Sequence, residues 1–260
     1  MAGAKDRRLT FNEVAQLYDD IRPSYPAPMF DELFRPLPPR PQVIEVGPGT
    51  GQATRDLLDR GAHVRAIEIS PAMAGILRAN LPTEELDISV GDFDVLDIPA
   101  GSADMVFSAT AYHWVSAKAQ VDRPATLLRS GGTIAIAELI QVDAPEDEGF
   151  FAAVQPFYER YGEGHTGSPA PSRENVDTSM RRALAADHRF RDVQLRRYDW
   201  DQTYSAADFR TLMVTYSGTQ MMDEVARNGL LGDIEAFAHD QFGGIVTRPL
   251  VVTLTTATLL

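Results

Sequence analysis

The chain has 260 residues, of which 44% are hydrophobic, so it carries enough apolar material for one large packed domain and does not have the composition of a disordered protein. It contains no cysteine, which excludes disulfides, thiolate catalysis and cysteine-ligated metal centres. The formal net charge of -13 argues against nucleic acid as a partner, because proteins that bind nucleic acids usually present a basic surface.

The first forty residues are predicted to be mainly helical. Apolar residues at helical spacing indicate a helix over 11–18, which Pro23 and Pro26 bring to an end. A second short helix is expected over 28–34, followed by a stiff, proline-rich connector. We therefore separate an N-terminal helical segment, residues 1–40, from a main domain, residues 41–260.

Strands and helices alternate from residue 43 onward. The predicted strands cover 43–46, 64–69, 88–90, 103–107 and 133–138, and the predicted helices cover 50–60, 71–80 and 116–128. Ser70 is expected to be the N-cap of the second of these helices, with Pro71 at its first position. Such alternation predicts a parallel sheet covered by helices on both faces.

Helices dominate the prediction beyond residue 138. We expect helices over 150–161, 176–187, 206–216 and 221–238, strands over 193–200 and 245–255, and a mobile loop over 162–171.

A glycine-rich turn, Glu-Val-Gly-Pro-Gly-Thr-Gly over residues 45–51, lies between the first strand and its helix. A dinucleotide site requires a glycine at position 52, where this chain has Gln52. The acidic Glu45 before the turn suits a cationic amino group better than a phosphate. A nicotinamide or flavin cofactor and a tight turn without any ligand are the alternatives.

Acidic residues follow the next two strands. Glu68 comes about twenty residues after the glycine turn, at a distance where a carboxylate reaches ribose hydroxyls, and its alternative role is that of a solvated charge. Asp92 would accept a hydrogen bond from an adenine amino group, with Phe93 against the base. The alternative for Asp92 is an Asx turn that caps the loop.

The segment 108–114 follows the fourth strand, at the sheet edge where ligands of open α/β sheets collect. His113 is the first candidate for a general base, since imidazole titrates near neutral pH, and a structural histidine is the alternative. His165, in the glycine-rich loop, is the second candidate, and a solvent-facing histidine is its alternative. Trp114 is interpreted as part of the pocket wall.

Together these motifs resemble the class I S-adenosylmethionine (SAM) dependent methyltransferases, and more closely the small-molecule branch that includes trans-aconitate methyltransferase-like proteins. The motifs that carry the resemblance are Tyr18-Asp19-x-x-Arg22-Pro23-x-Tyr25-Pro26, residues 45–51, Glu68, Gly91-Asp92 and Tyr112-His113-Trp114. The resemblance implies a Rossmann-like, doubly wound α/β sheet of seven strands, parallel except for an antiparallel last strand, with residues 1–40 as an N-terminal helical lid. It also implies SAM as the cofactor and S-adenosylhomocysteine (SAH) as the product.

The predicted strands 193–200 and 245–255 fit the family's last two strands, and a hairpin between them would need only ~2–5 residues, so residues 201–244 are expected to be a helical cap insertion, with 145–190 as a second cap segment. In the insertion, a substrate pocket would be lined by Met213, Tyr216, Ser217, Met221 and Met222, and a place in the core is the alternative for the methionines.

The cofactor contacts follow from this resemblance and from the strand ends. Tyr18 and Arg22 would act as a lid near the amino-acid end of SAM. The glycine turn would hold the methionine moiety. The complete predicted set is Tyr18, Arg22, Glu45, Gly47, Gly49, Gly51, Glu68, Ile69, Met73, Asp92, Phe93 and Ala109.

The resulting prediction is in-line transfer of the SAM methyl group to an oxygen, carbon or carboxylate of a small molecule. The amino-directed DNA methyltransferases carry Asn/Asp-Pro-Pro-Tyr/Phe after the fourth strand, whereas residues 108–111 here are Ser-Ala-Thr-Ala. No metal site is expected, and the polar N-terminus without any long apolar run predicts a cytoplasmic protein without membrane contact. The alternatives are a non-methylating SAM-fold protein, either a cyclase or a regulatory subunit, and a tRNA or protein methyltransferase.

Overall fold

The computed structural model describes residues 7–162 and 170–260, so most of the loop expected over 162–171 lies outside the described residues. The chain divides into two compact units. Unit 1 consists of Met1–Pro23, Gln141–Asn175 and Asp199–Val251, and unit 2 consists of Ser24–Ile140, Val176–Tyr198 and Val252–Leu260. The chain therefore passes between the units several times, and each unit is built from segments that are distant in sequence.

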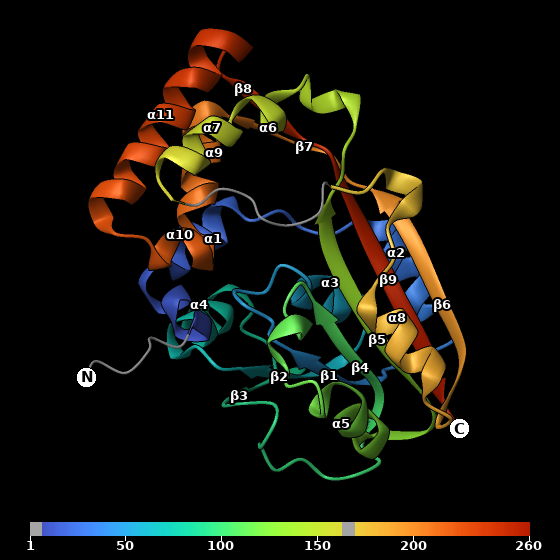
Figure 1. Cartoon of the computed structure of the whole chain (residues 1–260). Coiled ribbons are helices and arrows are strands. Elements are labelled where there is room, and N and C mark those ends of the chain that lie inside the picture. Colours follow the sequence, from blue (N-terminus) through green and yellow to red (C-terminus); the bar gives the residue numbers. More distant parts are fainter. Residues whose placement is uncertain (1–6, 163–169) are drawn as a thin grey trace. The chain divides into compact units, whose positions relative to one another are not determined.

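Unit 2 is built on a seven-stranded sheet with the order β3-β2-β1-β4-β5-β9-β6. Its strands are β1 (Gln42–Val46), β2 (His63–Glu68), β3 (Leu86–Val90), β4 (Ala103–Ala109), β5 (Leu128–Gln141), β6 (Phe190–Asp199) and β9 (Leu250–Leu259). The first five strands in this spatial order, β3, β2, β1, β4 and β5, are parallel to one another. Figure 1 shows the β9 arrow running opposite to its neighbours β5 and β6. The predicted seven-stranded, doubly wound sheet with an antiparallel last strand is confirmed.

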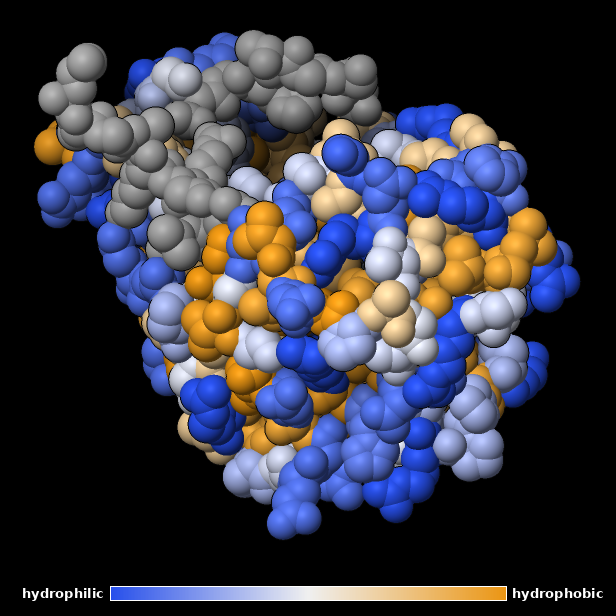
Figure 2. Space-filling model, turned by 90° about the horizontal axis from the view of Figure 1, so that it is seen from below, coloured by the Kyte–Doolittle hydropathy of each residue, from blue (hydrophilic) through white to orange (hydrophobic). Residues whose placement is uncertain are grey.

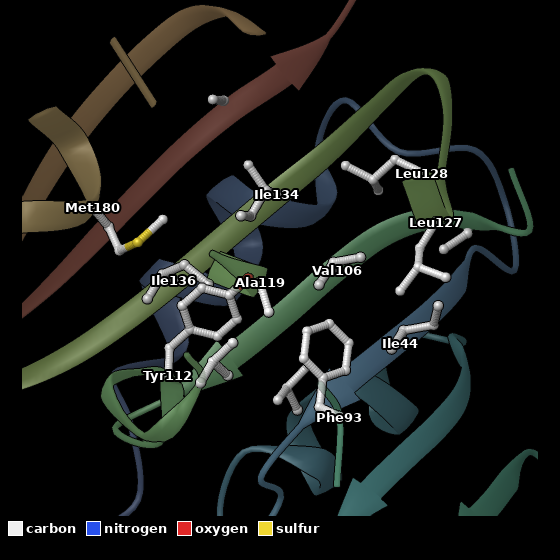
Figure 3. Close-up of a cluster of buried hydrophobic side chains, with 14 of the residues drawn as sticks. Ile44, Phe93, Val106, Tyr112, Ala119, Leu127, Leu128, Ile134, Ile136 and Met180 are labelled. Atoms are coloured by element: carbon white, nitrogen blue, oxygen red, sulfur yellow. The ribbon is translucent and has the colours of Figure 1, made fainter. Parts of the chain in front are cut away.

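Helices cover both faces of this sheet. They are α2 (Ala27–Phe34), α3 (Thr54–Asp59), α4 (Pro71–Asn80), α5 (Ala119–Leu127) and α8 (Ser179–Ala186), with a 3-10 turn η2 (Tyr112–Trp114). On one face, Ala119 of α5 and Met180 of α8 pack over Ile134 and Ile136 (Figure 3). On the other, Phe30 of α2 lies 6.0 Å from the ring of Phe107. Alternate residues of the central strands thus fill two separate layers, as expected for a sheet buried on both faces.

The helix expected over 50–60 begins later, at Thr54. The preceding turn contains Gly47, Gly49 and Gly51, all of which have positive φ angles that a right-handed helix cannot include. The helix predicted after Ser70 begins where expected, and the Ser70 hydroxyl accepts a hydrogen bond from Met73 N at 3.1 Å.

Unit 1 is mainly helical. It contains η1 (Arg7–Glu13), α1 (Ala15–Ile21), η3 (Pro145–Asp147), α6 (Phe150–Ala153), α7 (Gln155–Arg160), η4 (Arg173–Asn175), α9 (Ala206–Val214), α10 (Ser217–Met221) and α11 (Glu224–Phe242), with β7 (Gln202–Ser205) and β8 (Ile245–Arg248). Phe150 and Phe209 lie at its centre with edge-to-face rings 5.5 Å apart. Leu212, Leu231 and Ile234 are buried in the same cluster, so this unit has a hydrophobic core of its own.

The strand expected over 245–255 is wrong as a single element. It divides at Pro249 into β8, which pairs with β7 in a two-stranded antiparallel sheet, and β9, which joins the main sheet. Proline has no backbone N–H to donate, so a ladder ends there readily. The Pro249 carbonyl still accepts a hydrogen bond from Val142 N at 3.0 Å.

No helix within the described part of the chain combines the length and the apolar character needed to cross a membrane. The face shown in Figure 2 carries hydrophilic residues (blue) interspersed with areas of hydrophobic ones (orange). This mixture fits a chain in which 23% of residues are charged.

Candidate functional site

The glycine turn joins β1 to α3 and brings neighbouring backbone very close. Gly47, Gly49 and Gly51 have φ angles of +66°, +62° and +107°, in the region that favours glycine. A Cβ atom on Gly47 would lie 2.5 Å from the Cβ of Ala111, and one on Gly51 would lie 2.8 Å from Leu77 Cδ1. Larger side chains would therefore disturb both the turn and the elements packed against it.

Glu45, at the end of β1, is 1% exposed. The Thr54 hydroxyl donates to its Oε2 at 2.7 Å. Burial raises the pKa of Glu45 to about 8, with the Thr54 hydrogen bond lowering it and the charge of Glu68 raising it further. The acid is therefore mostly protonated at neutral pH, and a cationic group beside it would favour ionisation.

Glu68, at the end of β2, is 6% exposed, so the alternative of a solvated charge is wrong. Its Oε2 accepts from Gly49 N at 3.0 Å and its Oε1 accepts from Ser70 N at 2.8 Å. Burial raises its pKa, while these hydrogen bonds lower it. The carboxylate thus fastens the glycine turn to the start of α4, and it retains lone pairs for a ligand because two oxygens offer about four acceptor positions.

Asp92 and Phe93 follow β3. The Asp92 Oδ1 accepts from Asp94 N at 3.0 Å, which is the Asx turn considered as the alternative for this residue. Phe93 is 4% exposed, 6.5 Å from the Tyr112 ring and 5.2 Å from the Arg123 guanidinium. Figure 3 shows it within the buried cluster of unit 2. Its ring is therefore occupied by protein packing, and Asp92 is the more accessible of the two.

The end of β4 has a strained backbone. Thr110 has a φ of +55°, which is unusual for a β-branched residue. Its hydroxyl accepts from Tyr25 at 2.8 Å and its N–H donates to Ala137 O at 2.8 Å. Ser108 donates to Val46 O at 2.7 Å and ties β4 to β1. Ala109, a predicted cofactor contact, lies between these anchors and is half-buried.

His113 and Trp114 lie on η2, directly beyond β4, with their rings 4.7 Å apart. His113 is exposed at the surface. The protein around its imidazole lowers its pKa by desolvation, which favours the neutral form that accepts a proton. The second candidate base, His165, lies outside the described residues.

The remaining predicted contacts differ in their surroundings. Ile69 is half-buried next to Glu68, and Met73 on α4 is 3% exposed. Tyr18 and Arg22 belong to unit 1, where the Arg22 guanidinium lies 4.7 Å from the Tyr18 ring and donates to the Thr215 hydroxyl.

The sequence prediction missed Glu138 as a site residue. It lies on β5 one residue beyond Ala137, which pairs with Ala109, so Glu138 reaches the same sheet edge as Thr110. Its Oε2 is buried and has no hydrogen-bond partner among the described residues, and burial raises its pKa. Only its position at a predicted strand end would have indicated it. Nowhere in the described ranges are three or more acidic or histidine side chains grouped to hold a metal ion.

Comparisons with known proteins find methyltransferases among the similar proteins. The family model described as a methyltransferase domain matches residues 44–136. An uncharacterized methyltransferase of Mycobacterium tuberculosis is 34% identical over 132 residues, which are 51% of this chain and 53% of that protein. The Saccharomyces cerevisiae protein named probable S-adenosylmethionine-dependent methyltransferase CRG1 is 29% identical over 218 residues, covering 79% of this chain and 71% of that protein. The match to the first relative spans about half of either chain.

A solved structure shows a related fold. The Haemonchus contortus phosphoethanolamine N-methyltransferase 2, in complex with phosphomonomethylethanolamine and S-adenosylhomocysteine, is similar with a TM-score of 0.58. The comparison covers 100% of this chain and 61% of that chain at 14% sequence identity. At this identity the likeness concerns the fold alone.

Proposed function

Because residues 44–136 form a methyltransferase domain and the chain belongs to the class I SAM-dependent methyltransferases, we propose that this protein transfers the methyl group of SAM to a small-molecule acceptor. The observation that carries the proposal is the glycine turn framed by two buried carboxyl groups, Glu45 and Glu68. Glycine at three positions with positive φ lets a ligand approach the backbone closely.

The cofactor has a contact at each of three strand ends in this proposal. The turn over Gly47 to Gly51 holds the methionine part of SAM, and its ammonium group favours ionisation of Glu45. Glu68 accepts hydrogen bonds from the ribose hydroxyls with the lone pairs that Gly49 and Ser70 leave free. Asp92 accepts from the adenine amino group. Ile69, Met73 and Ala109 surround these contacts, and Tyr18 and Arg22 stay predicted cofactor contacts.

SAM supplies an electrophilic methyl group when bound, so this chain needs only to align the acceptor and exclude water. Bound SAM would supply the methyl group and take back the electron pair of its sulfur–carbon bond, and the residues of the glycine turn, Glu68 and Asp92 would hold it for this transfer. A hydroxyl or carbon acceptor also loses a proton. The proposed receivers are the neutral His113 imidazole and the Glu138 carboxylate, whose buried Oε2 has no partner among the described residues. A carboxylate acceptor would need neither.

Two features support a small-molecule acceptor over a nucleic acid. The net charge of -13 would repel a phosphate backbone. Residues 108–111 also lack the Asn/Asp-Pro-Pro-Tyr/Phe signature of the amino-directed DNA methyltransferases.

Calorimetry and transfer assays test the proposal together. Purified protein should bind SAH with a dissociation constant of micromolar order. Glu68→Ala and Asp92→Ala should each weaken this binding tenfold or more, and unchanged affinity would refute their roles. Methyl-labelled SAM is then incubated with low-mass metabolites, RNA or protein, and label should enter only the low-mass fraction. Binding of SAH without labelling of any fraction would favour a non-methylating protein.

A further inference from the structure

Two guanidinium groups of unit 1 meet at one tyrosine. Arg22, at the end of α1, has its Cζ 4.7 Å from the ring centroid of Tyr216, and Arg248, at the end of β8, has its Cζ 5.8 Å from the same centroid. Tyr158 and Tyr204 belong to the same group, because the electrostatic effects of Tyr216 and Arg248 reach their hydroxyls and change their pKa values. We call these five residues the arginine–tyrosine cluster.

The two arginines of the cluster have neutral partners. Among the described residues, neither Arg22 nor Arg248 forms an ion pair with a carboxylate. Arg22 donates to the hydroxyl and carbonyl oxygens of Thr215, and Arg248 donates to the Gln141 side chain at 3.2 Å. Three other arginines of unit 1 do form ion pairs: Arg160 with Asp233, Arg173 with Asp201 and Arg210 with Glu235.

Two tyrosine hydroxyls of the cluster are buried, those of Tyr204 and Tyr216, and within the described ranges neither has a well-aligned hydrogen-bond partner. Arg248 interacts with the Tyr204 hydroxyl, and because a guanidinium only donates hydrogen bonds, the O–H hydrogen of Tyr204 can still be donated. Tyr204 is only 8% exposed, and buried polar groups normally have a partner. Burial raises the pKa of Tyr204, with the two arginines opposing the rise, and raises the pKa of Tyr158 to about 12. The hydroxyls of Tyr204 and Tyr158 therefore keep their protons and remain donors.

Two unneutralised cations beside donor hydroxyls fit one kind of ligand. A carboxylate or phosphate accepts several hydrogen bonds at once, and guanidinium groups bind such oxyanions in a bidentate manner. A neutral ligand would leave both charges uncompensated. A cationic ligand would be repelled by the two arginines.

We propose that the arginine–tyrosine cluster binds the oxyanion group, a carboxylate or a phosphate, of a small molecule. The site needs only residues of unit 1, whereas residues 44–136, which match the methyltransferase model, lie entirely in unit 2.

Calorimetry on the full-length protein without SAM tests the site. Succinate and inorganic phosphate are the probes, and the neutral diamide succinamide is the control ligand. At least one oxyanion should bind and succinamide should not. Arg248→Gln should weaken oxyanion binding at least tenfold, and Tyr204→Phe, which keeps the ring and its packing, should weaken it severalfold.

The matched control is Arg160→Gln, which removes an exposed positive charge from the same unit outside the cluster. This variant should bind the oxyanion as the unmodified protein does. The proposed site would be overturned if neither succinate nor phosphate binds. It would also be overturned if Arg248→Gln and Tyr204→Phe both bind the oxyanion as tightly as the unmodified protein does. An equal loss in Arg160→Gln would do the same, since it would indicate a general charge effect.

SAH binding, measured on the same samples, separates the two proposals. Oxyanion binding without SAH binding would support the site and contradict the proposed function. SAH binding without oxyanion binding would contradict the site alone. If Arg248→Gln weakens SAH binding as much as oxyanion binding, the cluster is not a separate oxyanion site, and the proposal is overturned.

Discussion

The carboxyl group of Glu45 is buried beside Thr54, and its pKa is raised from the ordinary value of 4.5 to about 8. At a pH between 4.5 and about 8, Glu45 is ionised in the unfolded chain but stays protonated in the folded chain. The contribution of Glu45 to the free energy of unfolding is therefore fully present below pH 4.5 and is lost as the pH rises toward 8, by up to roughly 1.4 kcal/mol per pH unit. Glu45→Gln should remove this slope. Urea unfolding from pH 5 to 8 measures it, and equal slopes for both proteins would contradict the assignment.

Alanine substitutions at Gly47 and Gly61 distinguish the cost of backbone strain from the cost of a close side-chain contact. Gly47 lies in the glycine turn, and Gly61 follows α3. Both have positive φ, but a Cβ on Gly47 would lie 2.5 Å from Ala111, whereas one on Gly61 would meet open space. Gly47→Ala should cost about 1–3 kcal/mol more than Gly61→Ala and abolish most SAH binding. Urea unfolding and calorimetry provide the two measurements. Similar behaviour of the two variants would show that the close contact with Ala111 is unimportant.

Glu138 is predicted to receive the acceptor's proton. Glu138→Gln preserves the shape of the side chain but cannot take up a proton, so methyl transfer to a hydroxyl or carbon acceptor should fall by about 10²-fold or more, with SAH affinity retained. His113→Asn is the parallel variant for the other candidate base. Radiolabel transfer rates over pH 6 to 9 compare the two. If neither variant slows transfer, the acceptor needs no base, as a carboxylate would not.

At the scale of single elements, the N-terminus of α11 offers a direct test. The Asp223 carboxylate accepts hydrogen bonds from Val225 N at 2.9 Å and Ala226 N at 3.3 Å. Asp223→Ala should therefore reduce the free energy of unfolding by about 1 kcal/mol. Asp240→Ala, near the other end of the same helix, removes an acid that does not cap it and should change stability by less than about 0.5 kcal/mol. Urea unfolding measures both variants, and equal losses would argue against the cap.

Helices and strands with strong local sequence signals were predicted well. The prediction failed where one or a few residues decide the point at which an element begins or ends. The strands from β1 to β5 and the Ser70 cap follow from apolar runs and from capping chemistry that act within a few residues. Pro249 interrupts an apolar run that otherwise reads as one strand, and only the pairing of β8 with β7 shows that the run serves two sheets. Helix α3 starts late because the turn before it needs left-handed glycines.

At the scale of the whole molecule, ligand binding should couple to stability. SAH that binds only the folded chain at one hundred times its dissociation constant should add about 2.7 kcal/mol to the free energy of unfolding. Thermal unfolding with and without SAH measures the shift in melting temperature. Glu68→Ala, with binding weakened tenfold or more, should lose about half of this stabilisation or more, and an undiminished shift in this variant would show that SAH stabilises the protein by other contacts.

The sequence by itself determined the fold class, the cofactor and the order of the strand-end acids, because the glycine turn, Glu68 and Asp92 are each recognised within a few residues of a strand. Tertiary structure decided what depends on packing between distant segments. Phe93 is enclosed by Tyr112 and Arg123, and the oxygen of Glu138 is buried without a partner among the described residues. The arginine–tyrosine cluster joins positions from 22 to 248. Local propensity carries no information on such contacts, since they form only when the chain folds back on itself.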